Sequence, residues 1–251
     1  MSIHERAGQI ALQKDLVNIP KLMSHYYRLK PDMNMVEEKV TFGTSGHRGS
    51  AFHRSFNEQH ILAITQAVVD YRHGAGITGP LYLGIDTHAL SQAAYITAIE
   101  VLVANGVNII IHKSDGFTPT PVISHAIITA NQCSGSKADG LIITPSHNPP
   151  QDGGIKYNPP HGGPAEGEIT QWVEDRANTY LRQELEGVKR EDYAQAILSD
   201  FVQAVDLIQP YVDDLINVID MDAIAKANLQ IGVDPLGGSG IYYWAEIAKR
   251  Y

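Results

Sequence analysis

Segments of helical periodicity alternate with short apolar runs through the middle of this chain. Apolar side chains fall on one helical face over residues 57–71, and a second apolar helix is indicated from 91 to 104. Short apolar runs, each of a length typical of a buried strand, lie at residues 81–86, 107–112 and 140–144. Strands that alternate with helices at this spacing predict a layered α/β/α domain with a mostly parallel sheet. The functional loops of such a domain collect at the carboxyl ends of the strands.

The segment before this pattern is assigned to an N-terminal extension. Residues 1–39 are predicted to be mostly helical, in one piece that ends at Pro20 and a second over residues 21–29. We expect this extension to serve in packing or in oligomer contact, which leaves a homodimer open. The α/β domain itself is assigned to residues 40–200, beginning with a short strand at residues 40–42.

The segment after this pattern indicates the beginning of a second domain. An amphipathic helix over residues 168–185 and helical residues 193–219, interrupted by Pro210, lead to an apolar run at 229–234 that predicts a strand. One strand and one helix cannot close a core of their own. We therefore expect residues 201–251 to be a linker and the truncated start of a second, similar α/β domain. In the helix at 168–185, the side chains expected to point inward are Trp172, Val173 and Tyr180.

Composition and charge narrow the class of protein. The 251 residues are 43% apolar and 19% charged with a net charge of -9, which is typical of a globular chain and argues against nonspecific nucleic-acid or anionic-membrane partners. A small anionic substrate in a locally basic cleft stays open. The single cysteine, Cys133, cannot form an intramolecular disulfide, and no run approaches the roughly 20 apolar residues of a membrane span. The expected location is the cytoplasm.

A proline-stiffened loop, residues 144–150 with the sequence Thr-Pro-Ser-His-Asn-Pro-Pro, follows the apolar run at 140–143. Its three prolines each fix φ and remove a backbone donor, so the loop can hold one side chain in one place. That side chain is Ser146, a candidate nucleophile at the end of a predicted strand. His147 is its neighbour, and because adjacent side chains on an extended loop usually diverge, His147 is expected to be a poor general base for Ser146.

Three serine chemistries compete for this loop. Acyl transfer is disfavoured because the flanks of Ser146 do not match G-x-S-x-G, although a triad is not excluded. A regulatory phosphorylation site is the second reading. The third is a serine that carries a phosphoryl group and passes it on, which needs a hard cation and positive side chains to hold the added negative charge.

Two basic residues could supply part of that positive charge. Arg48 belongs to a loop, residues 43–49, whose glycines and hydroxyls suit an anion, although loops of this composition are commonly only turns. Lys156 follows Gly153 and Gly154 on a short strand that would return close to Ser146, but a solvated strand lysine is an equally good reading.

Four segments, in this order along the chain, resemble the α-D-phosphohexomutase family, and they look most like its bacterial phosphoglucomutase members. They are residues 42–49 (Phe-Gly-Thr-Ser-Gly-His-Arg-Gly), 144–150, 153–158 (Gly-Gly-Ile-Lys-Tyr-Asn) and 233–238 (Val-Asp-Pro-Leu-Gly-Gly).

The resemblance implies a specific chemistry. Ser146 would carry the phosphoryl group in the interconversion of glucose 1-phosphate and glucose 6-phosphate through glucose 1,6-bisphosphate, and its phosphate would be a ligand of Mg²⁺. Lys156 would act as general acid or base, Arg48 would lie beside the reacting phosphate, and His147 would be a further catalytic residue. The phosphate-binding residues would be Thr44, Ser45, Arg48, His147 and Lys156. A phosphomannomutase of the same family, and a non-catalytic fragment that binds phosphorylated ligands or a partner, are the alternatives.

The resemblance also has departures. Members of the family have four domains and a metal loop with the pattern Asp-x-Asp-x-Asp-Arg, of which Asp220-Met221-Asp222 is the nearest imitation, and there a helix start is the better interpretation. The remaining metal ligands and the sugar-selecting loop are therefore expected outside this chain. We expect these 251 residues alone not to convert sugar phosphates.

Overall fold

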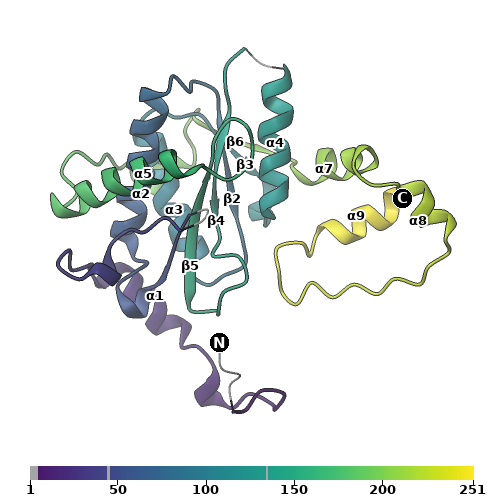
Figure 1. Cartoon of the computed structure of the whole chain (residues 1–251), viewed down its shortest axis with the longest axis horizontal. Helices are drawn as coiled ribbons and strands as arrows, with labels where there is room; N and C mark the ends of the chain where they lie inside the picture. Colours follow the sequence, from purple (N-terminus) through teal and green to yellow (C-terminus); the bar gives the residue numbers. More distant parts are fainter. Residues whose placement is uncertain (1–4, 44–45, 134) are drawn as a thin grey trace.

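A six-stranded sheet with the order β1-β5-β4-β2-β3-β6 forms the centre of the molecule. In the computed structural model, which describes residues 5–43, 46–133 and 135–251, strands β4, β2, β3 and β6 run parallel and β5 runs antiparallel to both of its neighbours (Figure 1). The mostly parallel α/β sheet predicted from the sequence is confirmed. The strands are β1 (Gly46–Ser50), β2 (Leu81–Ile85), β3 (Ile109–His112), β4 (Asp139–Ile143), β5 (Asp152–Asn158) and β6 (Val202–Val205).

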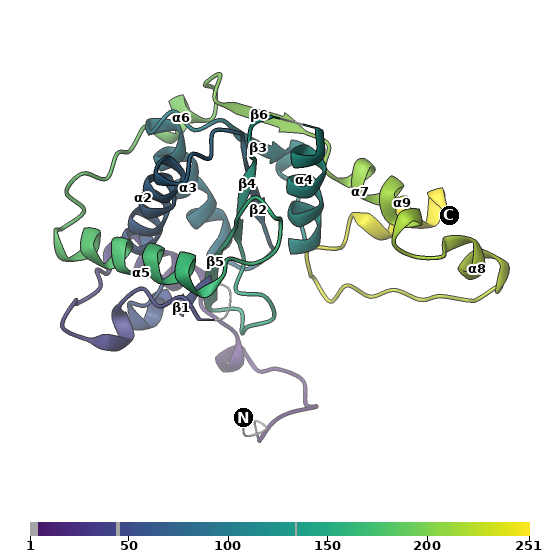
Figure 2. The same cartoon turned by 45° about the horizontal axis from the view of Figure 1, so that its top comes forward.

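Helices cover both faces of this sheet. Helices α2, α3 and α5 lie on one face and α4 on the other, with α7 and α9 beyond α4 (Figures 1 and 2). None of the helices in the described part of the chain is long and apolar enough to cross a membrane. The α-helices are α1 (Ile19–Arg28), α2 (Glu58–Gly74), α3 (Ser91–Ala104), α4 (Thr120–Cys133), α5 (Gly167–Arg182), α6 (Tyr193–Ala196), α7 (Ile208–Asp214), α8 (Met221–Lys226) and α9 (Tyr243–Arg250).

The hydrophobic core is divided by the sheet. The larger cluster fills the space between the sheet and α2, α3 and α5, and includes Ile64, Leu83 and Leu102. The smaller cluster joins α4 to α7 and α9 through Ile123, Val212 and Tyr243. Trp172 on α5, expected to point inward, is 42% exposed and instead stands edge-on against the ring of Tyr71.

Two prolines expected to end or interrupt helices lie in the first turns of helices instead. Pro20 is the second residue of α1, and the side chain of Asn18 caps this helix by accepting a hydrogen bond from the Lys21 amide. Pro210 is the third residue of α7. The first turn of a helix has no intrahelical use for the amide that proline lacks, so proline is tolerated there. The predicted helix before Pro20 is wrong, since the described residues there hold only turns and the short 3₁₀ helix Gln13–Asp15.

The first strand lies later than predicted. Residues 40–42 contribute only an isolated bridge from Phe42 to His47, whereas Gly46–Ser50, expected to be part of a loop, forms β1 against β5. Gly46 allows this pairing because a Cβ there would lie 2.3 Å from the Ile155 carbonyl oxygen. Glycines in a strand that mark a close backbone approach, rather than a turn, explain the difference.

The C-terminal segment differs from the prediction at both of its strands. Residues 202–205, expected to be helical, form β6 beside β3, so the sheet extends past residue 200. Residues 229–234, expected to be a strand, form no ladder and leave Leu229, Ile231 and Val233 exposed. A strand exists only where a neighbouring backbone accepts its hydrogen bonds. Asp220 caps α8 through the Ala223 amide, which confirms its predicted helix-start role.

A buried pair of stacked histidines joins β1 to α2. The rings of His47 and His60 lie 5.3 Å apart, and each ring uses one nitrogen as donor to a backbone carbonyl (of Ser55 and Glu38) and the other as acceptor from a backbone amide. Burial lowers the pKa of His47 to about 4, and burial together with the neighbouring His47 lowers the pKa of His60 to about 3. Both rings are therefore neutral in the folded protein near pH 7.

We expect the free energy of unfolding to fall as the pH drops below about 6.5. Below this pH the two histidines are protonated in the unfolded chain but stay neutral in the folded chain. Each of them therefore contributes up to about 1.4 kcal/mol per pH unit to the slope of the unfolding free energy against pH, until its folded pKa is reached. Urea unfolding at several values between pH 5 and 6.5 measures this slope, and His60→Gln should lower it by up to about 1.4 kcal/mol per pH unit. The exposed His73→Gln is the matched control and should leave the slope unchanged, and a slope that His60→Gln does not reduce would contradict the assignment.

Candidate active site

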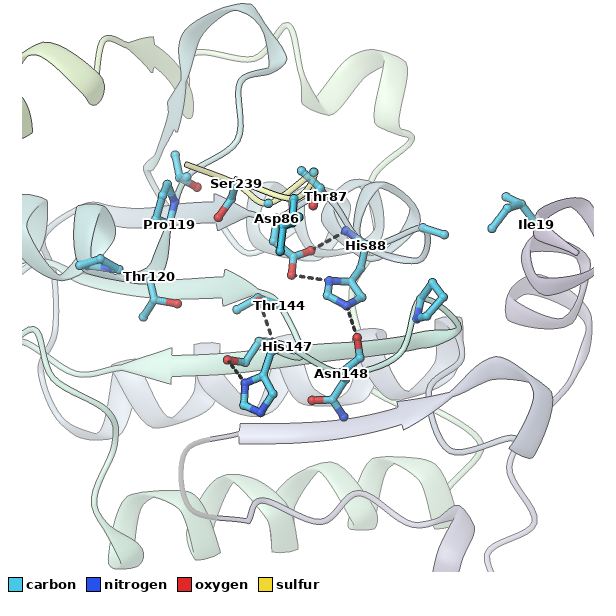
Figure 3. Close-up of a pocket in the computed structure, with 18 residues that line it drawn as sticks. Ile19, Asp86, Thr87, His88, Pro119, Thr120, Thr144, His147, Asn148 and Ser239 are labelled. Atoms are coloured by element: carbon cyan, nitrogen blue, oxygen red, sulfur yellow. Dashed lines mark hydrogen bonds and ion pairs between the residues drawn. The ribbon is translucent and has the colours of Figure 1, made fainter. Parts of the chain in front are cut away.

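The candidate site lies at the carboxyl ends of β2 and β4. These strands are parallel neighbours, so the segments that follow them meet at one edge of the sheet. A cavity of about 810 Å³ opens there between residues 86–89, 118–121 and the loop 144–150 (Figure 3). The glycine-rich turn at residues 236–239 forms part of its wall, and hydroxyl side chains line it at Thr87, Thr118, Thr120, Thr144, Ser146 and Ser239.

Ser146 is exposed in this cavity with an unusual backbone conformation. Its φ is 90°, in the left-handed region that residues with a side chain seldom adopt, and its amide donates a 2.9 Å hydrogen bond to Thr144 Oγ1. This turn brings the side chains of Ser146 and His147 together, with Ser146 Oγ 3.3 Å from His147 Nδ1. The expectation that the two side chains diverge was wrong, because it assumed an extended backbone at Ser146.

Arg48 contacts the serine loop from β1. Its Nε donates a 2.8 Å hydrogen bond to the carbonyl oxygen of Pro145, the residue before Ser146. The guanidinium is therefore held within one residue of the candidate nucleophile. Thr44 and Ser45, predicted to be phosphate-binding, lie outside the described residues.

Lys156 lies on β5, paired with Gly46 of β1 on one side and Ile142 of β4 on the other. Burial lowers the pKa of this lysine, the positive charge of Arg48 lowers it further, and the carboxylate of Asp86 opposes the shift. The short strand predicted to return close to Ser146 does so, because β5 pairs with β4 and Gly154 lies against Thr144 and Pro145 of the serine loop. The role of Lys156 at this loop stays a prediction.

The position of the serine loop depends on a glycine of β5. A Cβ on Gly154 would lie 2.5 Å from both the Pro145 Cα and the Thr144 carbonyl oxygen. Only a residue without a side chain permits this approach, so Gly154 sets how closely β5 and the loop pack.

Two functional candidates were missed from the sequence, Asp86 and His88 at the end of β2. His88 Nδ1 lies 2.8 Å from Asp86 Oδ2 (Figure 3). Ser91 Oγ donates a 2.5 Å hydrogen bond to Asp86 Oδ1. Burial alone would raise the pKa of Asp86, but hydrogen bonds from His88, Ser91 and Thr144 lower it overall. Their position in the sequence could have identified them. They directly follow a predicted strand, and polar residues at the carboxyl ends of neighbouring parallel strands lie at the same edge of the sheet.

The described residues do not form a magnesium site on their own. Among them no three His, Cys, Asp or Glu side chains are grouped closely enough to hold a metal ion. The carboxylate that lines the cavity, Asp86, is already engaged by His88 and Ser91. Phosphorylation of Ser146 would add negatively charged hard-oxygen ligands at this place.

Comparison with known proteins identifies the family. The family pattern described as phosphoglucomutase/phosphomannomutase, alpha/beta/alpha domain I, matches residues 39–184. The chain belongs to this family, and strands β1 to β5, helices α2 to α5 and the serine loop lie within the matched region.

Individual relatives agree with this assignment. The chain is 55% identical over 251 residues to the phosphoglucomutase of Komagataeibacter xylinus, which covers all of this chain and 45% of that protein. It is 32% identical to the cytoplasmic phosphoglucomutase of Mesembryanthemum crystallinum, over 73% of this chain and 34% of that protein. The solved structure of pp63/parafusin, a phosphoglucomutase of Paramecium, shares the fold with a TM-score of 0.68 at 21% identity, over 88% of this chain and 42% of that one. The chain thus spans less than half the length of these relatives.

Proposed function

We propose that the whole protein is a phosphoglucomutase and that Ser146 is its phosphoryl carrier. The observation that carries this proposal is the Ser146 hydroxyl, held in a strained turn at a cavity of about 810 Å³, with Arg48 hydrogen-bonded to the preceding carbonyl. The relative from Komagataeibacter xylinus, similar over the full 251 residues, supports glucose phosphates as the substrates.

The proposed reaction has two transfers. In the first, the bond between phosphorus and Ser146 Oγ breaks while a bond forms to the 6-hydroxyl oxygen of glucose 1-phosphate, whose proton passes to a general base. The product is glucose 1,6-bisphosphate. After this intermediate reorients, its 1-phosphoryl group returns to Ser146 Oγ, and a general acid protonates the sugar oxygen that is released as glucose 6-phosphate.

The basic residues around the loop are proposed to hold charge and move protons. Lys156 is the proposed general acid and base, since its lowered pKa makes proton release easier than in an exposed lysine. Arg48 would offset the charge of the phosphate on Ser146, and His147, within 3.3 Å of Ser146 Oγ, would hydrogen-bond the same group. Thr44 and Ser45 are retained as proposed phosphate-binding residues.

The cofactor, location and assembly are parts of the same proposal. Mg²⁺ would take one oxygen from the phosphate on Ser146 and neutralise charge on the transferred group, with its other ligands outside the set described above. A cytoplasmic location is supported by the similarity to the cytoplasmic phosphoglucomutase of Mesembryanthemum crystallinum. The proposed division has an extension at 1–39 and a phosphoserine domain from residue 40, with the start of a second domain after it. The boundary between the two domains moves from residue 200 to beyond β6, because β6 belongs to the first domain's sheet. A homodimer is also proposed.

The substrate assignment is tested by product analysis of the intact protein. With Mg²⁺ and a trace of glucose 1,6-bisphosphate, we expect ³¹P NMR to show conversion of glucose 1-phosphate to glucose 6-phosphate at least about tenfold faster than conversion of mannose 1-phosphate. Equal rates for the two sugars would replace the proposal with a broader phosphohexomutase. Binding of glucose 1-phosphate without conversion of either sugar would instead support the non-catalytic alternative.

A further inference from the structure

We propose that His88 is a positioning residue that holds the serine loop in its reactive conformation by bridging Asp86 to the Asn148 carbonyl. We call this arrangement of Asp86, His88 and Asn148 the loop clasp. The inference deepens the proposed function, on which its catalytic part rests.

The geometry of the loop clasp is specific at every contact. His88 Nδ1 lies 2.8 Å from Asp86 Oδ2, the His88 amide donates a 2.9 Å hydrogen bond to Asp86 Oδ1, and His88 Nε2 lies 3.0 Å from the Asn148 carbonyl oxygen (Figure 3). Asp86 is only 7% exposed and is fixed from behind by Ser91. The imidazole therefore has one fixed orientation, and its far nitrogen points at the loop.

The bridge requires a donor at each end of the ring. A carbonyl oxygen only accepts hydrogen bonds, so His88 Nε2 carries a proton, and a carboxylate likewise favours a proton on Nδ1. The doubly protonated ring donates a hydrogen bond to Asp86 and to the Asn148 carbonyl at the same time. A neutral ring has one N–H, so it would donate to one of these oxygens and direct the lone pair of its other nitrogen toward the second. Consistent with this, the hydrogen bond to Asp86 raises the pKa of His88, with Asp152 as a second nearby carboxylate that raises it further.

The loop clasp acts on the part of the chain that carries the reacting group. The carbonyls of Pro145 and Asn148 flank Ser146 and His147, and they are held by two different basic side chains, Arg48 and His88. Beyond Asn148 the loop continues with two prolines, which have no amide to donate.

The side chain of Asn148 ties the same residue to β5. Its amide nitrogen donates a 3.0 Å hydrogen bond to Asp152 Oδ2. Asn148 is thus held between the end of β2 and the start of β5. This anchoring opposes relaxation of the strained turn at Ser146, which would move the hydroxyl away from the substrate.

The experiment compares three substitutions in the intact protein. His88→Phe keeps an aromatic ring without donors and is expected to lower kcat on the order of 10²-fold while KM changes by less than about threefold, because the nucleophile is misplaced and the substrate contacts remain. His88→Arg has donors that can reach both oxygens and should restore kcat to within about fivefold of the natural protein. The exposed His73→Phe is the matched control and should behave as the natural protein.

Amide hydrogen exchange separates this inference from the proposed function. The peptide that covers residues 144–151 should exchange at least about tenfold faster in His88→Phe, with β2 and α3 unchanged, whether or not the protein is a mutase. Unchanged exchange in that peptide, or an unchanged kcat in a folded His88→Phe protein, would overturn the loop clasp. Faster exchange in a protein that transfers no phosphoryl group would instead overturn the proposed function and leave the structural bridge standing.

Discussion

Replacing Ser146 with alanine is expected to lower kcat for glucose 1-phosphate conversion by at least about 10⁴-fold, because the variant lacks the oxygen that accepts and returns the phosphoryl group. The free energy of unfolding should change little, since the Ser146 side chain is exposed. The hydrogen bond to Thr144 Oγ1 comes from the backbone amide of Ser146 and is kept in the variant. Steady-state rates and thermal unfolding of the intact protein measure the two effects.

Ser199→Ala is the matched control for this substitution. Ser199 lies just before β6, at the end of the sheet opposite the cavity, and its hydroxyl bonds only to the Ala196 carbonyl among the described contacts. We expect its kcat to stay within about twofold of the natural protein. A Ser146→Ala protein with comparable activity would show that the phosphoryl carrier is another residue.

The second large effect is expected from Gly154→Ala. The added methyl group would lie 2.5 Å from the Pro145 Cα and the Thr144 carbonyl oxygen, both backbone atoms that cannot rotate away. We expect the free energy of unfolding to fall by about 1–3 kcal/mol and kcat to fall on the order of 10²-fold, since the loop that carries Ser146 must move. Urea unfolding and steady-state kinetics measure both.

Gly74→Ala provides the contrast. Gly74 is the last residue of α2, and a Cβ there meets no atom within 4 Å. This substitution should leave kcat unchanged and keep or slightly raise stability, by up to about 1 kcal/mol, because alanine favours the helix. If both glycine variants behaved alike, the close approach of Gly154 would not be what positions the serine loop.

Local periodicity explains which elements could be predicted from the sequence. Helices α2 and α3 and strands β2 to β4 have apolar patterns that indicate which of their side chains are buried. Their predicted bounds agree with the structure within a few residues. Strand β1 has no such pattern, because glycine and polar residues fill it and its pairing with β5 depends on residues far along the chain. Prolines 20 and 210 were read as helix breakers, although their positions in first turns make them compatible with helices.

The candidate site was predictable to a similar extent. Ser146, Arg48 and Lys156 were found because proline stiffening, a strand end and a basic side chain are local signals. The contact between Ser146 and His147 was missed, because it depends on the φ of 90° at Ser146, which the amino-acid sequence does not indicate. His88 was missed because its two partners, Asp86 and the Asn148 carbonyl, come together only when β2 and β4 pair.

The most direct test of the central claim is to locate the phosphate. The intact protein is incubated with Mg²⁺ and glucose 1,6-bisphosphate whose phosphoryl groups carry ¹⁸O, digested, and analysed by mass spectrometry of the peptide that covers residues 140–156. We expect one ¹⁸O-labelled phosphoryl group on Ser146, and its replacement by an unlabelled one when unlabelled glucose 1-phosphate or glucose 6-phosphate is added. Phosphate on another residue, or labelled phosphate on Ser146 that neither sugar exchanges, would contradict this assignment.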